Sequence, residues 1–168
     1  MEHKKVLFAD LDGTLIETIS TGAFPKGIWD MRIRFDVLNI IKRGKFRRLI
    51  IVTNQGGIES GYITEADFRA KAEYLKAAFR DYLGMPVEYL YCATNAEDND
   101  SRKPNVGMLK TACEKFLGNR GMFAVKENML MIGDASGKVG QYSDTDKRTA
   151  DNFGIDYMDV NDFISYFS

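Results

Sequence analysis

Residues 6–14 read Val6-Leu7-Phe8-Ala9-Asp10-Leu11-Asp12-Gly13-Thr14, and this stretch decides the fold. Four consecutive apolar residues are typical of a strand buried on both faces of a parallel sheet, and they end at two carboxylates. Side chains two apart on a strand point the same way, so Asp10 and Asp12 can reach one spot. Two carboxylates held together need a cation or a shared proton. Taken alone, a solvated Asp-Gly turn explains the pair about as well.

Further apolar runs of strand length alternate with helical segments along the chain. Strands are expected at residues 49–52, 87–91, 129–132 and 155–158. One helix is expected after the N-cap Thr64, stopping at Gly84, and another from about Asn105 to Leu117. This alternation predicts an α/β protein with a three-layer, Rossmann-like fold around a central parallel sheet. Ligands bind such sheets at the carboxyl ends of the strands.

Length and composition indicate a single folded domain over residues 1–168. The chain is 45% hydrophobic, and 23 basic residues against 24 acidic ones leave a net charge of −1. This balance excludes wholesale disorder and argues against binding nucleic acid by bulk electrostatics. No apolar run could span a bilayer, and the first five residues, which include His3, do not resemble a signal peptide. No membrane partner is therefore expected. Two cysteines are too few for a disulfide framework, so a reducing cytoplasmic location is expected.

Chemistry-bearing residues also follow the other expected strands. Thr53-Asn54 precedes two glycines, and a hydroxyl followed by backbone N–H groups suits a phosphate. Lys103 lies just before a helix and supplies a point positive charge for an anion. Asp134 follows the fourth expected strand and adds a third carboxylate, so the sequence predicts a Mg²⁺ site at this edge of the sheet. Each signal is weak alone, but their conjunction at four strand ends is specific.

In this order the motifs resemble those of the haloacid dehalogenase superfamily of phosphohydrolases. They stand here as residues 10–14, Thr53, Lys103 and residues 133–134, so the resemblance spans essentially the whole chain. It implies that Asp10 attacks phosphorus and forms an aspartyl-phosphate, while Asp12 acts as general acid and then general base. It also implies that Thr53 and Lys103 hold the transferring phosphoryl oxygens.

The same resemblance implies the remaining site residues. Mg²⁺ would be bound by the Asp10 and Asp134 carboxylates and the Asp12 carbonyl, with Asp146 supporting the metal site. Further contacts to a phosphorylated substrate are expected from four residues: Gly13, Arg32, Asn54 and Arg102.

Spacing and local motifs narrow the expected substrate. Only 40 residues separate Asp12 from Thr53 and 49 separate Thr53 from Lys103, which leaves no room for the cap domain that superfamily members usually insert there. The site should therefore be open. Stretches at 24–32, 102–108 and 133–138 resemble the phosphatase domain of polynucleotide kinase 3′-phosphatase, which removes 3′-phosphates from broken DNA ends. The leading expectation is a phosphomonoesterase of DNA repair that acts on a 3′-phosphorylated DNA or RNA end.

Two alternatives stay open. The first is a small-molecule phosphatase of the histidinol-phosphate or heptose-bisphosphate type, which shares Thr-Asn-Gln and Arg-Lys-Pro. Those proteins usually carry a Cys/His zinc loop before the lysine, whereas the stretch from Cys92 to Lys103 has one cysteine and no histidine, so no zinc is expected. The second is a non-catalytic phosphate-binding module, although a second catalytic acid such as Asp12 counts against it. Both enzyme groups commonly carry an arginine where this chain has Glu59-Ser60.

Overall fold

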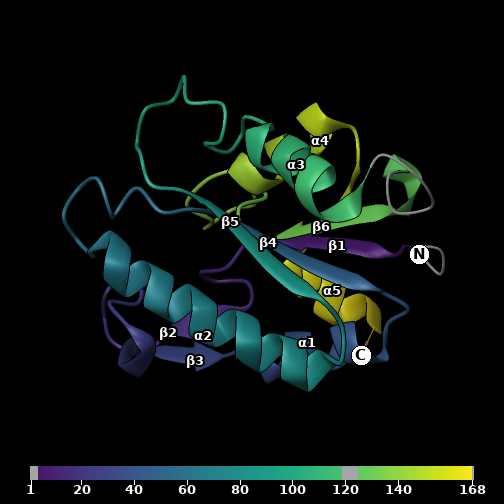
Figure 1. The fold of residues 1–168 in the computed structure, drawn as a ribbon, viewed down its shortest axis with the longest axis horizontal. Coiled ribbons are helices and arrows are strands. Elements are labelled where there is room, and N and C mark those ends of the chain that lie inside the picture. Colours follow the sequence, from purple (N-terminus) through teal and green to yellow (C-terminus); the bar gives the residue numbers. More distant parts are fainter. Residues whose placement is uncertain (1–3, 119–124, 168) are drawn as a thin grey trace.

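The computed structural model describes residues 4–118 and 125–167, which places His3 outside the described residues. Its centre is a five-stranded sheet with strand order β5-β4-β1-β6-β7 (Figure 1). Neighbouring strands pair in parallel throughout. Every strand expected from the sequence is present to within two residues: β1 (Val6–Ala9), β4 (Arg48–Asn54), β5 (Val87–Cys92), β6 (Met129–Gly133) and β7 (Asp156–Asp159).

Helices cover both faces of the sheet, which gives the three layers that the sequence predicts (Figure 1). One face carries α1 (Phe35–Arg43), α2 (Glu65–Leu83) and α5 (Val160–Phe167), and the other carries α3 (Gly107–Ala112) and α4 (Thr145–Phe153). Side chains of β1 alternate between the two layers: Leu7 packs with the first group and Phe8 with the second. No helix of the described ranges is both long and apolar enough to cross a membrane.

The helix α2 begins and ends where the sequence predicts. The Thr64 hydroxyl accepts a hydrogen bond from the Asp67 N–H at 3.1 Å, and Gly84 ends the helix in the left-handed conformation with φ of 68°. The second expected helix starts two residues late, at Gly107, because Asn105 instead uses its side-chain amide to bind the carbonyl groups of Glu97 and Asn99. Its last turn, Cys113–Leu117, is π-helical.

The interval between β1 and β4 contains elements that the sequence analysis did not resolve. These are a two-stranded antiparallel sheet of β2 (Ile16–Thr18) and β3 (Met31–Ile33), a short 3-10 turn at Ile28–Asp30, and α1. Strands of three residues are too short to show a hydrophobic period. Within the described residues this interval forms no separate cap domain, in line with the expected open site.

Candidate active site

The carboxyl ends of β1, β4 and β6 meet at a cavity of about 290 Å³. This is the edge at which parallel sheets bind ligands. Eight of the residues predicted from the sequence line this cavity: Asp10, Asp12, Thr53, Asn54, Arg102, Lys103, Asp134 and Asp146. Residues as far apart in the chain as Asp10 and Asp146 therefore converge at the carboxyl edge of the sheet.

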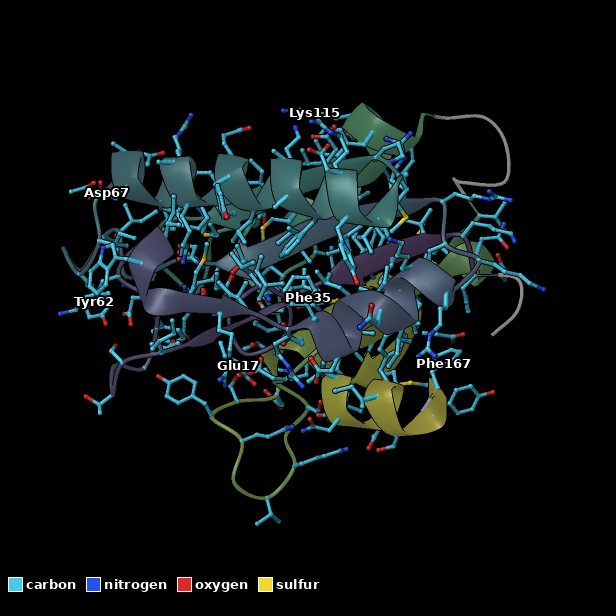
Figure 2. All side chains as sticks on the ribbon, turned by 90° about the horizontal axis from the view of Figure 1, so that it is seen from below. Glu17, Phe35, Tyr62, Asp67, Lys115 and Phe167 are labelled. Carbon is cyan, nitrogen blue, oxygen red and sulfur yellow. The ribbon has the colours of Figure 1, made fainter. Side chains whose placement is uncertain are left out.

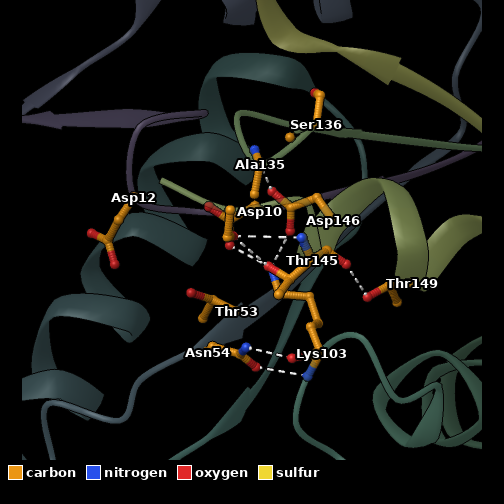
Figure 3. A network of polar contacts seen from close by, with 12 residues as sticks. Asp10, Asp12, Thr53, Asn54, Lys103, Ala135, Ser136, Thr145, Asp146 and Thr149 are labelled. Carbon is orange, nitrogen blue, oxygen red and sulfur yellow. Dashed lines mark hydrogen bonds and ion pairs between the residues drawn. The ribbon is translucent and has the colours of Figure 1, made fainter. Parts of the chain in front are cut away.

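A buried ion-pair cluster forms the floor of the cavity (Figure 3). The Lys103 ammonium lies 2.6 Å from Asp10 Oδ1 and 2.6 Å from Asp146 Oδ1. All three residues are buried. Asp146, in the first turn of α4, is fixed further because its Oδ2 accepts a hydrogen bond from the Ala135 N–H at 3.1 Å. One buried cation thus bridges two carboxylates.

The three carboxylates of Asp10, Asp134 and Asp146 face one ammonium group, and the pKa values of Asp10 and Asp134 are raised. Burial raises the pKa of Asp10 well above its usual range, and Asp146 and Asp134 raise it further against the opposing effect of Lys103. Burial, together with Asp146, raises the pKa of Asp134 to about 6. Burial alone would lower the pKa of Lys103, but Asp10 and Asp146 outweigh it and raise that pKa. A second cation at the floor would offset this excess negative charge.

The residues present fit Mg²⁺. One carboxylate oxygen each of Asp10, Asp134 and Asp146 lie within 4.8 Å of one another, and hard oxygen ligands are those that Mg²⁺ prefers. Asp134 reaches this position because it packs against Gly13: a Cβ on Gly13 would lie 2.1 Å from Asp134 Oδ2. Gly13 also has φ of 85°, a conformation that favours glycine. The first motif thus requires glycine for two independent reasons.

Gly13 and Asn54, both expected to bind substrate, make hydrogen bonds within the protein in this structure. The Gly13 N–H donates to the Ile16 carbonyl at 2.8 Å rather than toward the cavity. The Asn54 side chain accepts from the Lys103 N–H at 2.9 Å and donates to the Lys103 carbonyl at 3.0 Å, so both ends of its amide are occupied. Asn54 therefore holds the backbone from which the Lys103 ammonium reaches the carboxylates.

Asp12 stands apart from the ion-pair cluster (Figure 3). Its Oδ2 accepts a hydrogen bond from Gln55 Nε2 at 2.7 Å, and the same amide group donates to Thr53 Oγ1 at 3.0 Å. Because a hydroxyl both accepts and donates, Thr53 can still donate its hydrogen to a phosphoryl oxygen. Gln55 was not among the residues predicted from the sequence; its place directly after Thr53-Asn54 in the same polar loop was the available signal.

Glu59 supports the loop that bears Arg102. Its carboxylate accepts hydrogen bonds from the Asn95 N–H at 2.5 Å and the Thr94 hydroxyl at 2.9 Å. These two bonds, with a smaller contribution from the Arg102 charge, lower the pKa of Glu59. Arg102 in turn donates to the Thr94 carbonyl at 2.8 Å while lining the cavity. Glu59 therefore helps to position Arg102 at the cavity through the backbone of Thr94 and Asn95.

Arg32, for which a substrate contact was expected, is not among the described residues that line the cavity. It lies on β3 with 73% of its side chain exposed and forms a 2.6 Å ion pair with Glu17 on β2. The hairpin geometry explains this, because Arg32 and Glu17 are directly opposite in the antiparallel register. Four further basic residues also pair with carboxylates: Arg34, Lys138, Lys147 and Arg148.

Aromatic side chains form the mouth of the cavity. Phe24 and Pro25 line it from the loop between β2 and β3, and Tyr142 lines it from the 135–144 loop. Tyr62 lines it from the segment before α2 (Figure 2). The buried Asp30 carboxylate organises the first of these loops by accepting hydrogen bonds from the Ser20 N–H and the Lys26 N–H at 2.9 and 3.1 Å. The cavity therefore combines a charged floor with a largely aromatic mouth.

Comparisons with known proteins agree with this chemistry. The chain matches the family model described as "Polynucleotide kinase 3 phosphatase" over residues 5–164. It is 30% identical over 161 residues to the "Probable D-glycero-D-manno-heptose-1,7-bisphosphate 7-phosphatase" of Thermoplasma acidophilum, covering 94% of this chain and 90% of that protein. It is also 30% identical over 172 residues to an uncharacterized protein of Autographa californica nuclear polyhedrosis virus, covering 97% and 87%.

A solved structure shows the same fold. The D,D-heptose 1,7-bisphosphate phosphatase from B. bronchiseptica, complexed with magnesium and phosphate, has a TM-score of 0.69 at 20% identity, covering 91% of this chain and 78% of that one. Fold, site and relatives together define a phosphatase of the haloacid dehalogenase superfamily. Within that superfamily the chain belongs to the polynucleotide kinase 3 phosphatase family, whose model covers almost its whole length.

Proposed function

We propose that the protein is a Mg²⁺-dependent phosphomonoesterase that hydrolyses a small phosphate ester through an aspartyl-phosphate on Asp10. The observation that carries this proposal is the convergence of Asp10, Lys103, Asp134 and Asp146 on one cavity floor. When bound to the three carboxylates, Mg²⁺ would supply positive charge that offsets them and the incoming phosphoryl group.

The chain's own residues divide the chemistry between them. An Asp10 carboxylate oxygen attacks phosphorus, and the bond from phosphorus to the ester oxygen breaks as Asp12 donates a proton to that oxygen. Asp12 then takes a proton from water, whose oxygen attacks phosphorus and releases Asp10 and orthophosphate. Lys103 and Thr53 hold phosphoryl oxygens during both steps. The Lys103 ammonium group is hydrogen-bonded to Asp10, and Thr53 lines the same cavity.

Cavity size and a relative's substrate favour a small alcohol over a polynucleotide. A volume of about 290 Å³ is at the lower end for ligand pockets and suits a compact phosphate ester. The Thermoplasma relative is named for a heptose bisphosphate. We therefore place the sugar or amino-alcohol phosphate ahead of the nucleic acid end that the sequence motifs alone favoured.

A 3′-phosphorylated DNA or RNA end is the second candidate substrate. The family model carries the polynucleotide 3′-phosphatase description. Phe24 and Tyr142 are 50% and 98% exposed at the cavity mouth, and exposed aromatic rings can stack on bases.

The first experiment measures phosphate release from 4-nitrophenyl phosphate with Mg²⁺ or with EDTA. We expect Mg²⁺-dependent turnover that Asp10→Asn abolishes and that Asp151→Asn, at an exposed aspartate paired with Lys147, leaves unchanged. Turnover that survives Asp10→Asn would contradict the mechanism. Rates on heptose 1,7-bisphosphate, histidinol phosphate and a 3′-phosphorylated oligonucleotide then identify the substrate. A preference of more than about tenfold in kcat/KM for the oligonucleotide, about 1.4 kcal/mol, would reverse our order of candidates.

A further inference from the structure

A lysine is buried inside the helical layer next to the active site. Lys71 lies on α2 between the apolar residues that pack this helix on the sheet, and its side chain is only 1% exposed. Burying an ammonium group costs several kcal/mol unless a partner compensates it. Its partner among the ion pairs of the described residues is Asp12, whose Oδ1 lies 3.5 Å from Lys71 Nζ. The ring of Phe68, 5.6 Å from the same nitrogen, adds a cation–π contact.

Lys71 and Gln55 hold the two oxygens of one carboxylate. Asp12 Oδ2 is hydrogen-bonded to Gln55, whereas Asp12 Oδ1 is buried and accepts no hydrogen bond from the described residues. The attraction of Lys71 is therefore what compensates Oδ1. A carboxylate restrained at both oxygens has a defined direction, and Figure 3 shows Asp12 turned away from the cluster of Asp10, Lys103 and Asp146.

We propose that Lys71 is a positioning residue that fixes the Asp12 carboxylate for proton transfer. This inference rests on the proposed function, in which Asp12 serves the ester oxygen and then the attacking water. Both transfers need an Asp12 oxygen within hydrogen-bond reach of the reacting oxygen. Because Lys71 belongs to a long helix capped by Thr64 and Gly84, it provides a rigid support. Lys71 itself is not among the residues that line the cavity.

The test compares two esters that differ in their need for a proton. The leaving group of 4-nitrophenyl phosphate is stable without protonation, whereas that of phenyl phosphate is more basic and depends more on Asp12. Lys71→Met keeps the length of the side chain and removes its charge. We expect kcat on phenyl phosphate to fall about tenfold more than kcat on 4-nitrophenyl phosphate, with KM little changed. The control Lys76→Met removes a lysine of the same helix that pairs with Glu88. It should leave kcat unchanged on both esters.

A double variant separates positioning from packing. In an Asp12→Asn background, Lys71→Met should cause no further leaving-group-dependent loss, because the carboxylate it positions is gone. Equal slowing of both esters by Lys71→Met, or the same loss in both backgrounds, would overturn the inference. If Lys71→Met does not fold, Lys71→Gln should show the same selective loss, and its absence would overturn the inference as well. A wild-type protein that hydrolyses neither ester with Mg²⁺ would instead overturn the proposed function, and this inference with it.

Discussion

At the residue scale, the balance of charge around Lys103 governs what the site can bind. Three carboxylates with neighbouring oxygens face one ammonium group that contacts two of them. Removing that ammonium would leave buried carboxylates unpaired, which typically costs about 3–5 kcal/mol. The raised pKa values of Asp10 and Asp134 show that even the intact cluster favours either protonation or an added cation.

This imbalance predicts that stabilisation by Mg²⁺ grows with pH. Because the pKa of Asp134 is about 6 in the folded protein and about 4 for an unfolded aspartate, the folded state binds more protons between these values. The contribution of Asp134 to the free energy of unfolding is therefore fully present below about pH 4 and is lost as the pH rises to about 6. Mg²⁺ needs the deprotonated carboxylate, so its effect increases over the same interval.

Thermal unfolding with EDTA and with Mg²⁺ measures this dependence. We expect the rise in Tm caused by Mg²⁺ to be larger at about pH 7 than at about pH 5, and Asp134→Asn to remove most of the difference. A Tm increase of equal size at both pH values would argue against Mg²⁺ binding at the three carboxylates.

The sequence predicted which residues the ends of the buried strands bring together. Asp10 and Asp134 directly follow β1 and β6 and Thr53 lies at the end of β4, so the parallel sheet brings all three to one edge. The roles of Asn54, Gln55 and Lys71 depend instead on where a side chain points after packing. A lysine in an amphipathic helix gives no sign in the sequence that its ammonium group turns inward toward a carboxylate, because most lysines are exposed.

At the scale of elements, the long and strongly patterned ones were predictable. β1, β4 and β6 are continuous apolar runs, and α2 carries both a capping threonine and a stopping glycine. The β2–β3 pair, α1, α4 and α5 were not predicted, because short elements give too few residues to establish a period. The loops that shape the cavity mouth depend on hydrogen bonds between distant segments, such as Tyr62 with the Phe24 carbonyl, which no local pattern contains.

The loop of residues 94–102 offers a test of how such an element shapes substrate binding. Glu59→Gln weakens the acceptor that holds the Thr94 hydroxyl and the Asn95 N–H, and so loosens the backbone to which Arg102 is bound. We expect a several-fold rise in KM with little change in kcat, since a hydrogen bond contributes about 1 kcal/mol net. Steady-state kinetics on the preferred ester measure this.

The matched control for that variant is Glu73→Gln, which removes a carboxylate that accepts from the Tyr89 hydroxyl on the surface of α2. It should leave both constants unchanged. A fall in kcat with unchanged KM for Glu59→Gln would place Glu59 in the chemical step and not in the support of the binding loop.

At the scale of the whole molecule, the net charge of −1 limits how the protein can hold a substrate. Several basic residues are paired with carboxylates on the surface. The basic run at positions 42–48 leads into the first residue of β4, at the end of the sheet opposite the cavity. Among the described residues that line the cavity, the cations are Lys103 and Arg102. Two cations at one cavity suit a single phosphoryl group.

This distribution predicts a weak dependence of catalysis on salt. Lys103 is buried at the cavity floor, and buried pairs are screened much less than exposed ones. We expect kcat/KM on the preferred small ester to change by less than about threefold between about 50 and 200 mM salt, whereas a protein that neutralised many backbone phosphates would lose about 10³-fold or more in affinity. Measuring kcat/KM for the small ester and for a 3′-phosphorylated oligonucleotide across this range separates the two. A steep fall in kcat/KM for the oligonucleotide with rising salt would show that a longer basic surface contributes to binding. If kcat/KM for the oligonucleotide at low salt also exceeded that for every small ester, the nucleic acid end would be favoured as the substrate.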